Sequence, residues 1–143
     1  MLIAQVIRDK GAAVYTLASE ATLEEAAREM NEKRVGALIV IDAEGELVGV
    51  LSERDIIREI ARRGPAALDD RVAIAMTREV IVASLDESVD EGLGRMTDRR
   101  VRHLPVLAEG RLVGIISIGD LVKHRIAVAE AEAAAMQAYI SAQ

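Results

Sequence analysis

An internal repeat fills most of this chain of 143 residues and constrains its fold more than any other feature. The first half matches the second half at one offset up to a polar turn. At that turn the second half lacks one residue, and beyond it the match continues at an offset one residue shorter. Such a deletion is tolerated best in a surface hairpin turn. We therefore expect two units of one design. The matched pairs are Val14 and Val80, Thr22 and Ser88, Glu25 and Glu91, Met30 and Met96, Arg34 and Arg100, Leu38 and Leu104, Gly49 and Gly114, and Asp55 and Asp120.

Each repeat has the pattern β-α-β-β-α. The first helix of each follows a capping-box sequence, Thr22-x-x-Glu25 or Ser88-x-x-Glu91. Two strands rich in Val and Ile then flank a turn that contains glycine, which is typical of a hairpin. Pro105 predicts that its strand lies at a sheet edge or is irregular there. The expected strands are Val14–Leu17, Val35–Ile41, Leu47–Leu51, Val80–Ala83, Val101–Leu107 and Leu112–Ile116, and the closing helices are Glu53–Arg63, which Gly64-Pro65 ends, and Ile118 onward.

One such unit is too small to bury both faces of its sheet, so we expect two copies packed about a pseudo-two-fold axis in one α/β domain. The expected divisions are repeat 1 at 5–63, a linker at 64–77, repeat 2 at 78–126 and a C-terminal tail at 127–143. Residues 1–13 resemble the run into the second repeat and are expected to form a short helix. The tail favours helix, with a weakly apolar face at Val128, Ala131, Ala135 and Tyr139. Packing of that face on its own domain and packing on a second subunit are both open.

Composition excludes several classes of function. The net charge of −6 argues against general attraction to nucleic acid or anionic lipid. No Cys is present, which removes disulfides, thiolate metal sites and Cys nucleophiles. The longest apolar run, 35–41, is too short to span a bilayer, so we expect a soluble cytoplasmic protein. The two histidines, His103 and His124, have neither metal-ligand spacing nor triad partners, so we expect no enzyme and no metal site.

Paired segments in the two repeats resemble CBS domains, and together they resemble a Bateman module. The segments are 35–40 with 47–55 and 101–106 with 112–120. The likeness covers about residues 5–126 and is closest to the stand-alone class of such modules. It implies that the cleft between the repeats binds an adenosyl ligand: AMP, ADP, ATP, NAD or S-adenosylmethionine. No cofactor is implied beyond that ligand.

Two Ser-x-x-Asp motifs, Ser52 with Asp55 and Ser117 with Asp120, follow the last strand of each repeat. From the residues alone each is a good helix cap. The resemblance implies a second role, in which Ser holds a phosphate and Asp accepts hydrogen bonds from both ribose hydroxyls, as an acceptor-only group can. Gly49 and Gly114 just before these motifs would let backbone approach a ligand closely.

The two clefts are predicted to be unequal. Arg102 and His103 precede one strand, where the first repeat has Gly36 and Ala37. Arg suits phosphate, and the resemblance implies that basic residues here hold it. The resemblance also implies that each cleft takes a residue from the opposite repeat, Thr16 for one and Val82 for the other. The main site is therefore predicted at Thr16, Val35, Ala37, Arg102, His103, Leu104, Ser117 and Asp120, with adenine against aliphatic side chains, and a weaker second site at Ser52, Arg54, Asp55 and Val82.

The predicted function is that of a regulatory sensor whose packing changes when an adenosyl nucleotide binds. A protein-interaction module with degenerate clefts, acting on a regulated partner protein, is the alternative. The resemblance further implies a homodimer, without fixing a head-to-head or head-to-tail arrangement.

Overall fold

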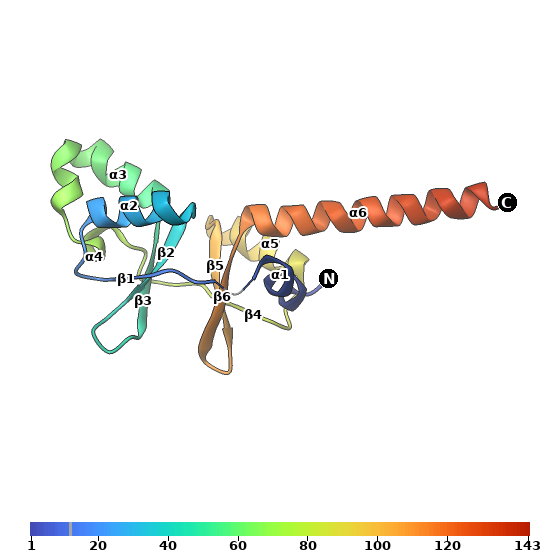
Figure 1. Cartoon of the computed structure of the whole chain (residues 1–143), viewed down its shortest axis with the longest axis horizontal. Coiled ribbons are helices and arrows are strands. Elements are labelled where there is room, and N and C mark those ends of the chain that lie inside the picture. Colours follow the sequence, from blue (N-terminus) through green and yellow to red (C-terminus); the bar gives the residue numbers. More distant parts are fainter. Residues whose placement is uncertain (12) are drawn as a thin grey trace. The chain divides into compact units, whose positions relative to one another are not determined.

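The computed structural model describes residues 1–11 and 13–143 and divides into two compact units, each of which holds one copy of the repeat (Figure 1). One unit spans Val14–Ile81 and is named the first-repeat unit here. The other, the second-repeat unit, combines Val82–Gln143 with the N-terminal segment. The predicted N-terminal helix is present as α1 (Ile3–Lys10), and it packs with the second repeat, not the first. Ala12, within the predicted repeat 1, lies outside the described residues.

The first-repeat unit is a three-stranded mixed sheet with helices. Strand β1 pairs in parallel with β2, which pairs antiparallel with β3. Its elements are β1 (Thr16–Ala18), α2 (Leu23–Lys33), β2 (Ala37–Ile41), β3 (Leu47–Ser52), α3 (Glu53–Arg63), the 3₁₀-helix η1 (Gly64–Asp69) and α4 (Val72–Ala75).

The second-repeat unit repeats this design. Strand β4 pairs in parallel with β5, which pairs antiparallel with β6. The element order, the hairpin and the α/β class are thus confirmed for both repeats. Besides α1, its elements are β4 (Ala83–Ser84), α5 (Val89–Arg99), β5 (His103–Ala108), β6 (Arg111–Ser117) and α6 (Ile118–Ser141).

Local signals position the helix ends. Helix α3 begins and ends at the predicted residues, because Ser52 caps its start and Gly64 follows its end with φ of +77°. The capping box at Thr22 is complete. At Ser88 only half of it is made: the Ser88 hydroxyl accepts from the Glu91 amide, and Glu91 does not return the bond.

The one-residue deletion in the second repeat relative to the first lies in its hairpin turn, as predicted. In the first hairpin, the Asp42 carboxylate accepts hydrogen bonds from the amides of Glu44 and Glu46 and so organises a longer turn. In the second, Glu109 and Gly110 both have positive φ, the conformation of a tight type I′ turn.

Pro105 predicted a strand that lies at a sheet edge or is irregular there, and only the second alternative holds. Strand β5 is the central strand of its sheet. Proline is accommodated because β4 is only two residues long and pairs with Val106 and Leu107, so that its ladder begins one residue after Pro105. The expected irregularity is present nearby, as a register shift between Val106 and Leu107.

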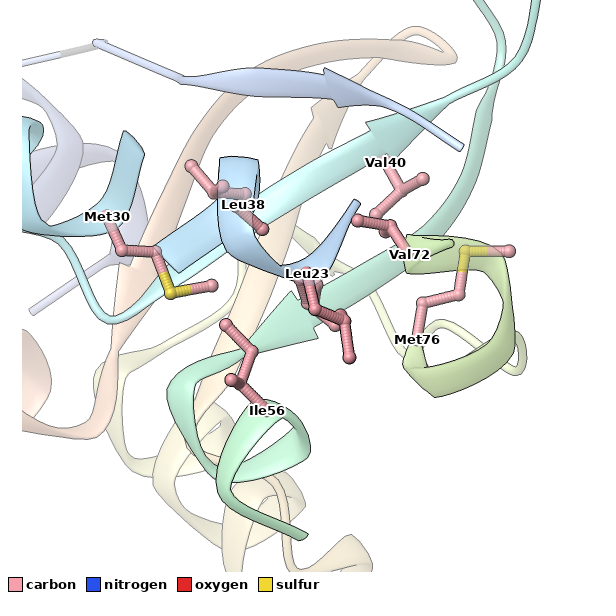
Figure 2. Close-up of a cluster of buried hydrophobic side chains, with 9 residues drawn as sticks. Leu23, Met30, Leu38, Val40, Ile56, Val72 and Met76 are labelled. Carbon is pink, nitrogen blue, oxygen red and sulfur yellow. The ribbon is translucent and has the colours of Figure 1, made fainter. Parts of the chain in front are cut away.

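Each unit has its own apolar core. Leu38, Val40 and Leu51 from the sheet of the first-repeat unit are fully buried beneath the helices, and Figure 2 shows this cluster. It is completed by Leu23, Ala26, Met30, Ile56, Val72 and Met76. The buried apolar residues of the second-repeat unit include Ile3, Val6, Met96, Leu104, Val106, Ile116 and Leu121.

Gly49 and Gly114, interpreted from the sequence as points of close approach to a ligand, are packed against segments of the protein itself. A Cβ at Gly49 would lie 2.6 Å from Met76 Sδ and 2.9 Å from the Thr77 carbonyl oxygen. A Cβ at Gly114 would lie 2.7 Å from Ile7 Cδ1. Each glycine therefore makes room for the segment that precedes the other repeat: the end of α4 on β3, and α1 on β6.

Substituting Gly49 with alanine should destabilise the protein by about 1–3 kcal/mol through overpacking. Gly114→Ala should cost less, since its only close neighbour is the end of a flexible side chain. The control is Gly94→Ala in α5, where a Cβ meets nothing within 4 Å; it should be neutral or stabilise by up to ~1 kcal/mol. Urea unfolding measures all three, and equal losses at Gly49 and Gly94 would refute the packing role.

Candidate functional site

The junction of β6 and α6 forms the centre of the candidate site. Ser117 caps α6, and its hydroxyl accepts a hydrogen bond from the Asp120 amide at 3.1 Å. In return, Asp120 Oδ2 accepts from the Ser117 amide at 2.8 Å. The predicted cap is therefore present in both directions, and it holds the Asp120 carboxylate at the end of the strand.

A lysine from α1 reaches this carboxylate. Lys10 Nζ lies 2.6 Å from Asp120 Oδ2 and donates a second hydrogen bond, of 2.7 Å, to the Ile115 carbonyl oxygen. The Lys10 side chain is 32% exposed and that of Asp120 is 25% exposed. The ammonium therefore occupies one carboxylate oxygen of a group that solvent still reaches.

The environment of Asp120 keeps it ionised. Burial acts to raise the pKa of its carboxyl, but hydrogen bonds from Lys10 and Ser117 and the charge of Lys10 together outweigh burial, so the pKa lies below its ordinary value. A carboxylate at neutral pH can only accept hydrogen bonds, which suits it to a pair of ligand hydroxyls.

The predicted basic residues lie beside this junction. His103 pairs with Ser117 across the β5–β6 ladder, and the Arg102 carbonyl accepts a hydrogen bond of 2.8 Å from the Ile118 amide, at the start of α6. Arg102 is exposed and His103 half-buried, while Leu104 is fully buried. One unit thus has the exposed residue Arg102, the N-terminus of α6 and Asp120 at the same junction, and these groups suit an anion and a polyol.

The equivalent junction in the first-repeat unit is differently occupied. Asp55 Oδ2 accepts from the Ser52 amide at 2.9 Å, and Oδ1 accepts from Arg58 Nη1 at 3.0 Å. The Asp55 side chain is only 7% exposed. Arg54, predicted to help at this site, is exposed at the start of α3. Both carboxylate oxygens of Asp55 are therefore engaged within its own unit.

The remaining predicted residues are distributed between the units. Thr16 is exposed on β1, Val35 is half-buried after α2, and Ala37 is buried at the start of β2. All three belong to the first-repeat unit. Val82, predicted for the Asp55 cleft, belongs to the second-repeat unit, where its carbonyl accepts a hydrogen bond from Arg95. The contribution of each to a site with residues of the other unit stays a prediction.

Sequence reasoning missed Lys10. The available signal was that the N-terminal residues resemble the segment leading into the second repeat. By that likeness, α1 should lie against β6 as α4 lies against β3. The contact itself joins residues far apart in the chain, and no local motif marks it.

No group of three or more His, Cys, Asp and Glu side chains suitable for a metal ion exists among the described residues. Nor does any helix in residues 1–11 or 13–143 combine the length and the apolar character needed to cross a membrane.

Comparison with known proteins identifies the architecture. The CBS domain family matches residues 7–62 and 71–127. Among related sequences, the mitochondrial CBS domain-containing protein CBSX3 of Arabidopsis thaliana is 31% identical over 96% of this chain and 71% of its own length. An uncharacterised 17.7 kDa protein of Acidianus ambivalens is 38% identical over 77% of this chain, and the match spans 66% of that protein, just under two thirds.

Solved structures agree. The CBS-domain protein ATU1752 of Agrobacterium tumefaciens superimposes with a TM-score of 0.85 at 38% identity, over 87% of this chain and 92% of its own. The CBS domain pair of protein MJ0100, solved with 5′-methylthioadenosine and S-adenosyl-L-methionine, superimposes with a TM-score of 0.76 at 27% identity, over 86% of this chain and 94% of its own.

Proposed function

Because this chain belongs to the CBS domain family as a tandem pair, we propose that it is a regulatory module that binds an adenosyl ligand at Asp120. The observation that supports this most is the site itself: an ionised, solvent-accessible carboxylate held at the start of α6 beside Arg102 and His103. The MJ0100 pair, solved with two adenosyl compounds, supports the class of ligand.

Each group has a distinct role in the proposal. Asp120 accepts hydrogen bonds from the two ribose hydroxyls, and Arg102 with the Ser117 end of α6 receives an anionic group on the 5′ side. That Thr16, Val35, Ala37 and Leu104 complete the site around adenine stays a prediction, and Leu104, which is fully buried, offers no exposed surface of its own. AMP, ADP, ATP, NAD and S-adenosylmethionine all carry the adenosine that this set recognises.

The Asp55 junction is the weaker site of the proposal. A diol there would compete with Arg58 for Oδ1 and would have to reach a carboxylate that is nearly buried. The contrast makes Asp120 the first site to fill and Asp55 the second.

A thermal-shift panel of the five adenosyl compounds, with guanosine nucleotides as controls, tests the proposal. A ligand at 100 times its Kd adds about 2.7 kcal/mol of stability, enough to raise Tm by roughly 5 °C or more. At least one adenosyl compound should do so while guanosine nucleotides do not. If none does, the chain does not bind these ligands and the partner-binding alternative replaces the proposal.

Lys10 should act as a competitor of the ribose. Its ammonium holds Asp120 Oδ2, so a diol that takes both carboxylate oxygens must displace it. Replacing Lys10 with methionine should tighten the binding of adenosine, which lacks a phosphate, by roughly threefold to tenfold, the size of one partly exposed ion pair. Arg8→Met, on the exposed part of the same helix, is the control and should change nothing. Weaker adenosine binding in Lys10→Met would show that Lys10 contacts the ligand instead.

A further inference from the structure

Helix α6 is much longer than its unit can cover. It runs for 24 residues from Ile118 to Ser141, about 36 Å at 1.5 Å per residue. Leu121 is its one buried residue, and every residue from Ala129 onward is exposed. Figure 1 shows the helix continuing past the rest of the second-repeat unit.

The exposed helix carries an apolar stripe with the spacing of a coiled coil. Its members, named the α6 seam here, recur at alternating steps of four and three residues, so they line one face of the helix. The large ones are well exposed: Val122 by 41%, Ile126 by 52%, Met136 by 62% and Ile140 by 64%. The seam consists of Val122, Ile126, Ala129, Ala133, Met136 and Ile140. It differs from the face predicted from the sequence, which contained Val128, Ala131, Ala135 and Tyr139.

The order of large and small residues along the seam fits an antiparallel copy of itself. When two seams run in opposite directions and Ile126 lies against the partner's Ala129, Val122 lies against the partner's Ala133. Met136 then lies against the partner's Gly119, at the start of α6. These layers each join a large side chain to a small one, which fills space evenly, while Ile140 lies beyond the start of the partner's α6 and has no seam residue opposite it. A parallel pair would instead set Ile126 against Ile126 and Ala129 against Ala129, leaving wide and narrow layers.

The charges beside the seam select the same arrangement. In the antiparallel register, Lys123 faces the partner's Glu130 and Arg125 faces the partner's Glu132. The two-fold symmetry repeats both contacts, and no like charges meet. All four residues are exposed. Arg125 also lies 3.4 Å from Asp90 of its own unit, a pair with both side chains more than half exposed, which leaves it able to turn to a partner.

We propose that the α6 seam is a homodimerisation surface, which pairs with the α6 seam of a second copy as an antiparallel two-helix coiled coil. A single antiparallel register gives both the large-to-small packing and the pairing of opposite charges. A second copy of the chain therefore provides a partner that satisfies both. The proposal does not depend on nucleotide binding, so the two can fail separately.

Disulfide trapping tests the pairing, and the absence of Cys from the chain makes it clean. Val122→Cys and Ala133→Cys, one carrying a size tag, are oxidised separately and as a mixture. The mixture should give the mixed disulfide as the main product. Neither variant alone should cross-link to itself, because in the antiparallel register identical residues 122 or 133 lie about 16 Å apart along the axis, beyond the ~7 Å Cα separation that a disulfide tolerates.

Two controls complete the trapping experiment. Val122→Cys mixed with Ala131→Cys, on the opposite face of α6, should give only background. Efficient self-linking of Val122→Cys would show a parallel pair and overturn the proposal. The proposal would also be overturned if the mixture cross-linked no more efficiently than either variant alone, whether the protein is then monomeric or bound to another protein through the seam.

Charge reversal gives an independent readout by analytical ultracentrifugation. Glu130→Lys/Glu132→Lys and Lys123→Glu/Arg125→Glu should each weaken the seam dimer by roughly tenfold or more, because four attractive contacts become repulsive. An equimolar mixture of the two variants should pair again. Glu44→Lys/Glu46→Lys, exposed in the first hairpin, carries the same charge change and should leave association unchanged. Equal weakening in this control, or no recovery on mixing, would contradict the seam.

Discussion

Replacing Asp120 with asparagine should weaken binding of the tightest adenosyl ligand by roughly 100-fold or more, since two hydrogen bonds to a charged acceptor are lost. The amide oxygen of Asn can still accept from the Ser117 amide, so the start of α6 should persist. Isothermal titration gives the Kd, and circular dichroism checks the fold.

Asp55→Asn is the matched control for Asp120→Asn. It makes the same chemical change at the equivalent position, where both carboxylate oxygens are already engaged by Ser52 and Arg58. We expect it to leave the first binding event nearly unchanged. If Asp55→Asn abolished that event and Asp120→Asn did not, the ranking of the two sites would be reversed.

The pH dependence of Asp120 follows from the direction of its pKa shift. A carboxyl with a lowered pKa in the folded protein contributes stability above its unfolded value of about 3.9 and loses it as the pH falls through the folded value. This group should therefore not limit ligand binding between about pH 5 and pH 8, where it stays charged.

Truncating Leu38 to alanine should destabilise the protein by about 2–5 kcal/mol. Leu38 is fully buried on β2 and is central to the cluster of Figure 2, so its loss leaves a cavity between the sheet and the helices. Urea unfolding followed by circular dichroism measures the change.

Ile57→Ala is the control for Leu38→Ala. Ile57 belongs to α3 of the same unit, but its side chain is 64% exposed. We expect a change of no more than about 0.5 kcal/mol. Comparable losses at the two positions would mean that Ile57 is covered in solution, and that the core assigned to this unit is incomplete.

Local and repeated signals predicted most of the fold. The match between the two halves predicted two β-α-β-β-α units, and the Ser52 cap with Gly64-Pro65 predicted both ends of α3. The first strand of each repeat starts later than predicted, at Thr16 and Ala83, because strand limits depend on which partner residues the neighbouring strand offers.

Features that depend on contacts between distant segments could not be predicted in the same way. Pro105 looked like an edge residue because its sequence does not reveal that the neighbouring β4 is too short to reach it. Gly49 and Gly114 were interpreted from their place beside Ser-x-x-Asp, whereas their close neighbours come from α4 and α1. Lys10 became part of the site only once α1 lay on β6.

The most direct test of the proposed function compares the tightest adenosyl ligand with its 2′,3′-dideoxy analogue, by isothermal titration of the natural protein and of Asp120→Asn. If the Asp120 carboxylate binds the ribose diol, the dideoxy analogue should bind the natural protein at least roughly tenfold more weakly, and the difference should nearly vanish in Asp120→Asn. Equal binding of both ligands to the natural protein would contradict the account.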